Sequence, residues 1–190
     1  MRWRELFEDL EGQAQSLERL ELDSEIADRT RAEIATVRLI NRLRAQVGQP
    51  VVLVLAGVGE LRGQLQRVGS DWLLVETSRE TVIPLDAVVM LKDLTPMALS
   101  EEGVDLISSR LSLRAVLRAV ARDRSPVVVR LISGGSITGT LERVGADFVD
   151  LSEHDLDVAP RPQRIRSRAT VPFAAIASCQ RTSPGWVNRG

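Results

Sequence analysis

Residues 59–72 read GELRGQLQRVGSDW, and residues 135–148 read GSITGTLERVGADF. The two stretches lie 76 positions apart, and the same offset holds without a gap over 50–77 of the first copy. Eleven of these 28 aligned positions are identical, whereas chance would give about one or two. The chain therefore contains an internal duplication, and we expect a fold built from two equivalent units.

The length and charge of the chain limit its general class. A chain of 190 residues can form two small domains, and the duplication favours this division. With 25 basic and 26 acidic residues the formal net charge is −1, so any attraction to nucleic acid must come from a local patch. The first residues lack an apolar leader, and no apolar run approaches membrane length. We expect a cytoplasmic protein with no membrane partner.

Apolar residues recur at helical spacing in the first 47 residues. Over 3–21 they alternate in steps of four and three, a stripe that also suits a coiled-coil seam. Asp23 and Ser24 break this segment, and a second helix is expected to continue to about Val47. The pattern predicts a helical hairpin or arm, through which the chain could bind a protein partner or self-associate.

Each copy of the repeat predicts a helix followed by five short strands. In the first copy, turn residues and two-residue alternation mark strands over 51–55, 60–68, 71–77, 80–85 and 87–92. The predicted fold class is α+β, with an N-terminal helical hairpin followed by two helix-plus-five-stranded small β-barrels. Its parts are the arm 1–47, the first barrel 48–94, the linker and helix 95–124, the second barrel 125–182 with an extended hairpin, and the tail 183–190.

The motif hydrophobic-x-Gly-x-Leu-x-x-hydrophobic around Gly63 and Gly139, preceded by a helix and a turn glycine, resembles the first motif of Sm and LSm proteins. This resemblance implies SH3-like barrels and RNA as a partner. The chain departs from the family at 72–73 (Trp-Leu) and 148–149 (Phe-Val), and it lacks the Arg-Gly of the second Sm motif, so the family's uracil-binding residues are not carried over. The whole chain also resembles an actinobacterial family of uncharacterised proteins sometimes labelled Fis-type transcriptional regulators, although the sequence shows no helix-turn-helix of that kind.

The first barrel is predicted to have two apolar faces. Alternation directs Val51, Leu53 and Leu55 toward the core, together with Leu73 and Val75. The opposite side is a candidate covered apolar face, formed by Val52, Val54, Trp72 and Leu74. Because exposed apolar patches of this size are rare, we expect a helix of the chain to cover it, or else a partner surface.

Two groups of arginines are candidate contacts for RNA, DNA or an acidic partner. The helix group recurs every four residues and has two counterparts at the repeat offset: Arg110, Arg114, Arg118 and Arg122, with Arg38 and Arg42. The hairpin group lies in an insertion of the second copy: Arg161, Arg164, Arg166 and Arg168. Each group has a simpler interpretation. The first is then a solvated helix face, and the second is a cross-strand ladder pairing Glu153 with Arg168, Asp155 with Arg166 and Asp157 with Arg164.

Nothing in the sequence predicts catalysis. His154 is the only histidine and is expected to be exposed in a loop, and Cys179 is expected to be a small buried side chain. Ser133–Ser136 is expected to be a turn, because no Gly-Lys-Ser/Thr follows it. We therefore expect no enzyme, metal, cofactor or small-molecule substrate. The leading hypothesis is a non-catalytic binding or adaptor protein with tandem Sm-like barrels, and the alternative is an RNA- or DNA-binding regulator.

Overall fold

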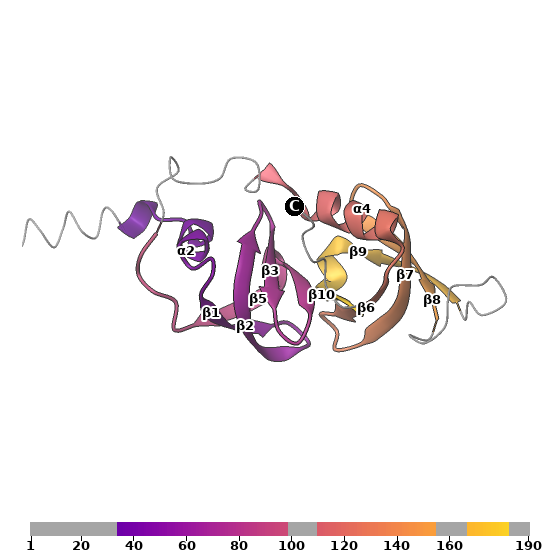
Figure 1. Cartoon of the computed structure of the whole chain (residues 1–190), viewed down its shortest axis with the longest axis horizontal. Helices are drawn as coiled ribbons and strands as arrows, with labels where there is room; N and C mark the ends of the chain where they lie inside the picture. The colour runs from indigo at the N-terminus through magenta and orange to yellow at the C-terminus, as the bar shows by residue number, and fades with distance from the viewer. Residues whose placement is uncertain (1–33, 99–109, 155–166, 183–190) are drawn as a thin grey trace, which may run out of the picture. The chain divides into compact units, whose positions relative to one another are not determined.

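The computed structural model describes residues 34–98, 110–154 and 167–182 (Figure 1). The chain divides into two compact units, Met1–Arg38 and Leu39–Gly190, and nearly all described residues belong to the second. No helix within these ranges is long and apolar enough to cross a membrane.

Ten strands dominate the second unit. In the first copy of the repeat they are β1 (Pro50–Leu55), β2 (Gly59–Val68), β3 (Trp72–Glu76), β4 (Glu80–Pro84) and β5 (Val88–Lys92). In the second copy they are β6 (Pro126–Leu131), β7 (Ser136–Val144), β8 (Phe148–Glu153), β9 (Ser167–Pro172) and β10 (Ile176–Arg181). The helices are α2 (Leu39–Ala45) and α4 (Leu113–Asp123), with 3-10 turns at Leu85–Ala87 (η1) and Phe173–Ala175 (η4). The predicted strand bounds of the first copy are confirmed to within one residue.

All ten strands belong to one antiparallel sheet in the order β5-β1-β2-β3-β4-β10-β6-β7-β8-β9. The first copy supplies the first five strands and the second copy the last five. The copies join where β4 pairs with β10, with Val82 opposite Cys179 and Thr81 opposite Gln180. The sheet is not closed, and its free edges are β5 and β9.

This single sheet shows that the predicted α+β fold class is wrong. The described chain is mainly β, and it forms one open sheet rather than two separate barrels. The end strand β4 of the first copy pairs with β10 of the other copy instead of closing its own barrel. The backbone groups of an edge strand can pair with any suitable strand, so side-chain alternation did not reveal this partner.

The described residues do not show the predicted N-terminal helical hairpin or coiled coil as an element of this fold. Residues 1–33, which hold most of that prediction, lie outside the described residues. Of the second helix, predicted to reach Val47, the structure describes helical residues 34–36, a break at 37–38 and the seven-residue α2. The helix predicted over 100–124 is described only as the 11-residue α4 and a short stretch before it. The tail 183–190 also lies outside the described residues.

The sheet packs around two hydrophobic cores, one for each copy. The first core contains Leu43 of α2 with strand residues Val51, Leu53, Leu55, Leu65, Val68, Leu73, Val75 and Ile83. The second contains Leu113 and Leu117 of α4 with Val127, Val129, Leu141, Val149, Leu151, Val171, Ile176 and Cys179, and it also includes Trp72 and Val82 of the first copy. The inward direction predicted for Val51, Leu53, Leu55, Leu73 and Val75 is confirmed.

The repeated glycines lie where two strands approach closely. A Cβ atom on Gly63 would lie 2.4 Å from the carbonyl oxygen of Glu76, and one on Gly139 would lie 2.0 Å from that of Ser152. Any larger side chain would have to displace the backbone of the neighbouring strand. This close approach explains why the duplication retains glycine at both positions.

The β8–β9 hairpin has a register one residue away from the predicted charge ladder. Glu153 lies opposite Ser167 rather than Arg168, so that predicted pair is wrong. The other two predicted pairs involve residues outside the described ranges. A slip of one residue would turn every side chain to the other face, and the buried pair Val149–Val171 therefore fixes the observed register.

The β3–β4 hairpin of the first copy is paired in the equivalent way. Val75 lies opposite Thr81, and the turn comprises residues 77–79. The turn is held by the backbone, with the Thr77 amide donating to the Arg79 carbonyl at 3.1 Å. As in the second copy, burial on one face of the sheet sets the pairing.

Candidate functional site: an arginine-lined groove on α4

The helix α4 is fixed at both ends by specific contacts. At its start the Ser112 hydroxyl accepts a hydrogen bond from the Ala115 amide at 3.4 Å, and the Asp71 carboxylate accepts one from the Leu113 amide at 2.7 Å. At its end Arg124 has a left-handed backbone, with φ of 56°, which terminates the helix. The first contact is local, whereas Asp71 ties α4 to the β2–β3 turn of the other copy.

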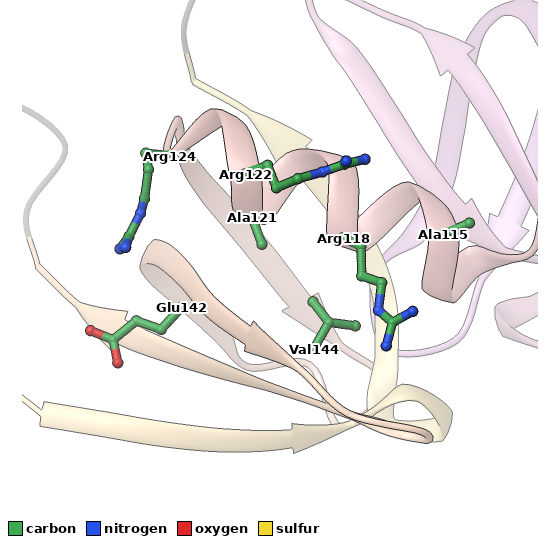
Figure 2. A pocket seen from close by; sticks show the side chains of 7 residues that line it. All are labelled: Ala115, Arg118, Ala121, Arg122, Arg124, Glu142 and Val144. Atoms are coloured by element: carbon green, nitrogen blue, oxygen red, sulfur yellow. The ribbon is translucent and has the colours of Figure 1, made fainter.

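A groove of about 640 Å³ lies beside α4. Its lining residues are Ala115, Arg118, Ala121, Arg122 and Arg124 from the helix and its end, with Glu142 and Val144 from β7. Figure 2 shows Arg118 and Arg124 extending from α4 toward the strand side, with Val144 and Glu142 across from the helix. The groove is thus lined by three arginine side chains, of which that of Arg122 runs along the helix, and it has a short apolar floor.

The opposite wall of the groove depends on a β-bulge in β7. Strand pairing shifts between Leu141 and Arg143, which leaves Glu142 as the extra residue. Bulges redirect the side chains around them. The Glu142 carboxylate accepts a hydrogen bond from the Ser152 hydroxyl and lies 3.8 Å from the Arg168 guanidinium, so part of its charge is already compensated.

The arginines of the groove have no acidic partner among the residues that the structure describes. The side chains of Arg118, Arg122 and Arg124 form no ion pair or hydrogen bond with the described residues, although Glu142 lines the same groove. The one acidic residue of α4, Asp123, is paired with Arg181. The segment 110–124 therefore carries a local positive charge, even though the whole chain is nearly neutral.

A neighbouring arginine is neutralised and does not add to this charge. Arg143 lies 2.9 Å from the Asp150 carboxylate. The hydrogen bond from the Thr170 hydroxyl, together with Arg143, holds the pKa of Asp150 below its usual range, so this carboxylate stays ionised. The free positive charge is therefore confined to the α4 side of the groove.

The structure places the helix arginines in different surroundings. Arg118 and Arg122 line the groove, Arg110 is exposed just before α4, and Arg114 is half-buried. Arg124 was not among the predicted candidates, because it lies beyond the helix end and outside the four-residue spacing. Its position after the last helical turn was the signal that could have identified it.

The counterparts of these arginines in the first copy do not form a second groove of this kind. The Arg42 guanidinium donates hydrogen bonds to the carbonyl oxygens of Leu94, at 3.1 Å, and of Thr95, at 2.8 Å. Arg42 therefore holds the linker after β5. Arg38 is exposed and belongs to the other compact unit.

The hairpin arginines are only partly described. Arg161, Arg164 and Arg166 lie outside the described residues. Arg168 lies in β9 opposite Ser152, with an exposed side chain near Glu142. The structure thus brings one hairpin arginine near the groove wall.

Two of the four residues of the candidate apolar face, Trp72 and Leu74, pack against the core of the second copy. Trp72 is only 5% exposed, and its indole Nε1 donates to the Leu111 carbonyl at 2.8 Å. Leu74 packs against the same core, while Val52 and Val54 are half-buried. These contacts tie the start of α4 to β3.

Two single residues differ in how well their positions were predicted. His154 is buried, with its Nε2 atom 2.9 Å from the Thr140 hydroxyl, so the prediction of an exposed loop histidine is wrong. Its backbone amide still follows the strand, donating to the Thr138 carbonyl. Cys179 is a buried free thiol, as predicted.

Comparison with known proteins gives this site no precedent. No family model, curated protein or solved structure matches the chain.

Proposed function

We propose that this protein is a non-catalytic nucleic-acid-binding protein that contacts phosphate groups through the groove on α4. The observation that carries the proposal is the set of three guanidinium groups, Arg118, Arg122 and Arg124, without acidic partners among the described residues. Guanidinium groups match phosphate oxygens in charge and in hydrogen-bond geometry.

The arrangement of these charges favours a polymer over a small anion. Residues four apart on a helix are separated by about 6 Å along its axis, and Arg124 follows at the helix end, so Arg118, Arg122 and Arg124 are spread along the groove and do not converge on one point. A row of cations can follow successive phosphates of one strand. The apolar floor, formed by Ala115, Ala121 and Val144, offers a surface for sugars or bases.

An acidic protein segment is the competing occupant. The near-neutral net charge supports no strong long-range attraction, so either ligand would have to be recognised locally. Arginine binds carboxylates and phosphates alike in bidentate geometry, so the preference for phosphates rests on the row of charges, which suits the regular phosphates of one strand. We also propose a cytoplasmic location, which suits the free thiol of the single cysteine.

The test measures binding to short single-stranded RNA and to duplex DNA at several salt concentrations, with fluorescence anisotropy as the readout. Replacing Arg118 and Arg122 with glutamine removes two charges and keeps helix propensity. We expect affinity to fall alike for all sequences, and the slope of log affinity against log salt to shrink by about two. Glutamine at the exposed Arg67 and Arg130, outside the groove, is the matched control and should leave the slope unchanged.

Two results would contradict the proposal. One is wild-type protein that binds neither nucleic acid at low salt. The other is an equal loss of affinity in the groove variant and in the control, which would indicate nonspecific charge. Binding to polyglutamate but not to RNA or DNA would assign the groove to an acidic protein instead.

A further inference from the structure

A second pocket, separate from the groove on α4, lies where the two copies of the repeat meet. Its volume is about 320 Å³, which is at the small end of the range for ligand sites. The first copy lines it with β2 and the β3–β4 hairpin, and the second copy lines it with β6 and β10. It shares no lining residue with the groove on α4.

The strand register gathers polar side chains on one face of the sheet in this pocket. Thr81 of β4 lies opposite Gln180 of β10. Ser178, two residues earlier in β10, lies opposite Arg130 of β6. Because residues two apart on a strand point to the same side, these four side chains share one face. The intervening Cys179 points to the other face and belongs to the hydrophobic core.

Three of these polar side chains have no partner among the residues that the structure describes. Ser178 is 2% exposed, yet its hydroxyl forms no hydrogen bond within the described ranges. The Gln180 amide and the Arg130 guanidinium, which line the same pocket, also form none there. Buried polar groups in native proteins are nearly always hydrogen-bonded. The missing partner is therefore a molecule that occupies the pocket, either water or a ligand.

The charge of this pocket is positive. Glu60 lines it, but its carboxylate lies 2.6 Å from the Lys92 ammonium group and 2.6 Å from the Arg62 guanidinium. The hydrogen bonds from Lys92 and Arg62 hold the pKa of Glu60 below its usual range, so this carboxylate stays ionised and is fully compensated. Arg130 has no such counterion within the described ranges and leaves an uncompensated positive charge.

Backbone contacts beside the pocket hold its walls in place. Gly57, in the turn between β1 and β2, has φ of 67°, and a Cβ atom there would lie 2.3 Å from the Ile132 carbonyl oxygen. Only glycine permits this approach. The hairpin that carries Glu60 and Arg62 is therefore fixed next to β6, which carries Arg130. The pocket exists without a ligand, so binding requires little rearrangement of the chain.

We propose that this pocket binds a small molecule through a phosphate group, with Arg130 as the charged contact and Ser178 and Gln180 as neutral hydrogen-bond donors. Guanidinium groups form strong charge-assisted hydrogen bonds to phosphate and carboxylate alike. A carboxylate, however, has only about four acceptor sites. Arg130, Ser178, Gln180 and the exposed Ser78 together carry more donors than that, so the three oxygens of a phosphate group satisfy them better.

The site is distinct from the nucleic-acid site in shape and in consequence. Its polar groups lie on adjacent strands around one small pocket, whereas the arginines of α4 are spread along a groove. Because both copies line the pocket, a bound ligand would also hold them together where β4 and β10 pair over two residues. Phosphate should therefore stabilise the folded chain.

The test follows assigned backbone amide shifts of the full chain by NMR during titration with inorganic phosphate, glycerol phosphate or acetate at constant ionic strength. We expect saturable shifts at Thr81, Ser178 and Gln180, with a dissociation constant on the order of 1 mM for inorganic phosphate. Acetate should bind on the order of tenfold more weakly, because it leaves donors of the pocket unpaired.

Two variants separate a ligand contact from a structural role. Arg130→Gln removes the charge and Ser178→Ala removes the buried hydroxyl, and each should weaken phosphate binding by about tenfold. Neither should change the urea midpoint appreciably in phosphate-free buffer, because neither group has a partner in the described protein. Adding phosphate should raise the midpoint of the wild type and leave that of Arg130→Gln almost unchanged.

The controls test the specificity of the site. Arg67→Gln removes another exposed arginine, outside the pocket, and should bind phosphate like the wild type. The Arg118→Gln/Arg122→Gln variant should keep the shifts in the pocket, so this proposal and the nucleic-acid proposal can fail separately. The present proposal is overturned if phosphate causes no saturable shift there, which would mean that water alone fills the pocket. It is also overturned if Arg67→Gln weakens binding as much as Arg130→Gln, or if acetate binds as tightly as phosphate.

Discussion

The ionisation of the Cys179 thiol reports how completely water is excluded from the junction between β4 and β10. The thiol lies opposite Val82 and is 2% exposed. Burial raises the pKa of Cys179 from 9.0 to about 12, only partly opposed by the nearby Arg181. In the unfolded chain the thiol ionises near its ordinary pKa, whereas in the folded protein it stays neutral. The unfolded state therefore binds fewer protons above pH 9, and stability must fall as pH rises.

The size of this effect follows from the two pKa values. Between the unfolded and folded values the free energy of unfolding falls by roughly 1.4 kcal/mol per pH unit, or about 2–3 kcal/mol from pH 9 to pH 11. Below pH 9 the contribution of Cys179 is constant. Few other side chains of this protein titrate in the alkaline range, because the sequence contains no tyrosine and a single lysine.

The assay is urea unfolding at several pH values for the wild type and for Cys179→Ala. The variant loses some packing, which shifts its curve by a constant amount, but it has no thiol to ionise. The difference between the two proteins cancels the contributions of all other groups. We expect the stability advantage of the wild type to decline steadily above pH 9. Parallel curves from pH 8 to about pH 11 would refute the reasoning, since they would mean that the thiol ionises equally in both states.

Two further predictions concern the duplicated turns and strands. Gly63→Ala should lower the free energy of unfolding by roughly 1–3 kcal/mol, because the new methyl group would lie 2.4 Å from a carbonyl of β3. Gly135→Ala meets nothing closer than 3.8 Å and should be nearly neutral in the same urea titration. Asp71→Ala should cost about 1 kcal/mol, because the Leu113 amide loses its acceptor. The equivalent change at Asp147, whose side chain forms no hydrogen bond among the described residues, should cost less than about 0.5 kcal/mol; equal losses at both would contradict the assigned contact.

The sequence was sufficient to predict the strands but not their partners across the copies. Glycines and two-residue alternation are local signals, and they located β1–β5 accurately. The pairing of β4 with β10 joins residues almost 100 positions apart through backbone groups that every residue carries. A local pattern contains no information about such a partner. For this reason the sequence predicted two barrels, whereas the structure has one sheet.

The errors of register and burial have a common cause. The β8–β9 register was inferred from charges, which lie on the solvated side and contribute little, while the buried pair Val149–Val171 determines it. His154 was assigned to a loop because it begins the insertion, yet its side chain reaches Thr140 in the sheet. In both cases long-range packing outweighed the local character of the residue.

The groove was predicted in part. The four-residue spacing identified Arg118 and Arg122, since a helix turns residues four apart to the same side. It missed Arg124, which lies beyond the helix end, and Glu142, which lines the groove from a bulge in another strand. Bulges shift alternation by one residue and leave no clear mark in a single sequence.

The divergence of the two copies follows their positions in the sheet. At the β4–β10 junction the first copy keeps Trp72 and Leu74 apolar, because the second copy covers them. Their counterparts Phe148 and Asp150 lie toward the outer edge formed by β9, and there Asp150 holds Arg143 and Thr170 in a polar network.

The β5 edge does not follow this trend. Its exposed Val89 and Met90 are more apolar than the buried Ala177 and Ser178 that correspond to them. The pairing of β5 with β1 skips Val89, which is therefore the extra residue of a β-bulge. Because a bulge interrupts the ladder of backbone groups, it limits the pairing of an edge strand with another chain. The same bulge occurs at Ala177 in β10, so both copies keep this irregularity although only β10 has a strand on its other side.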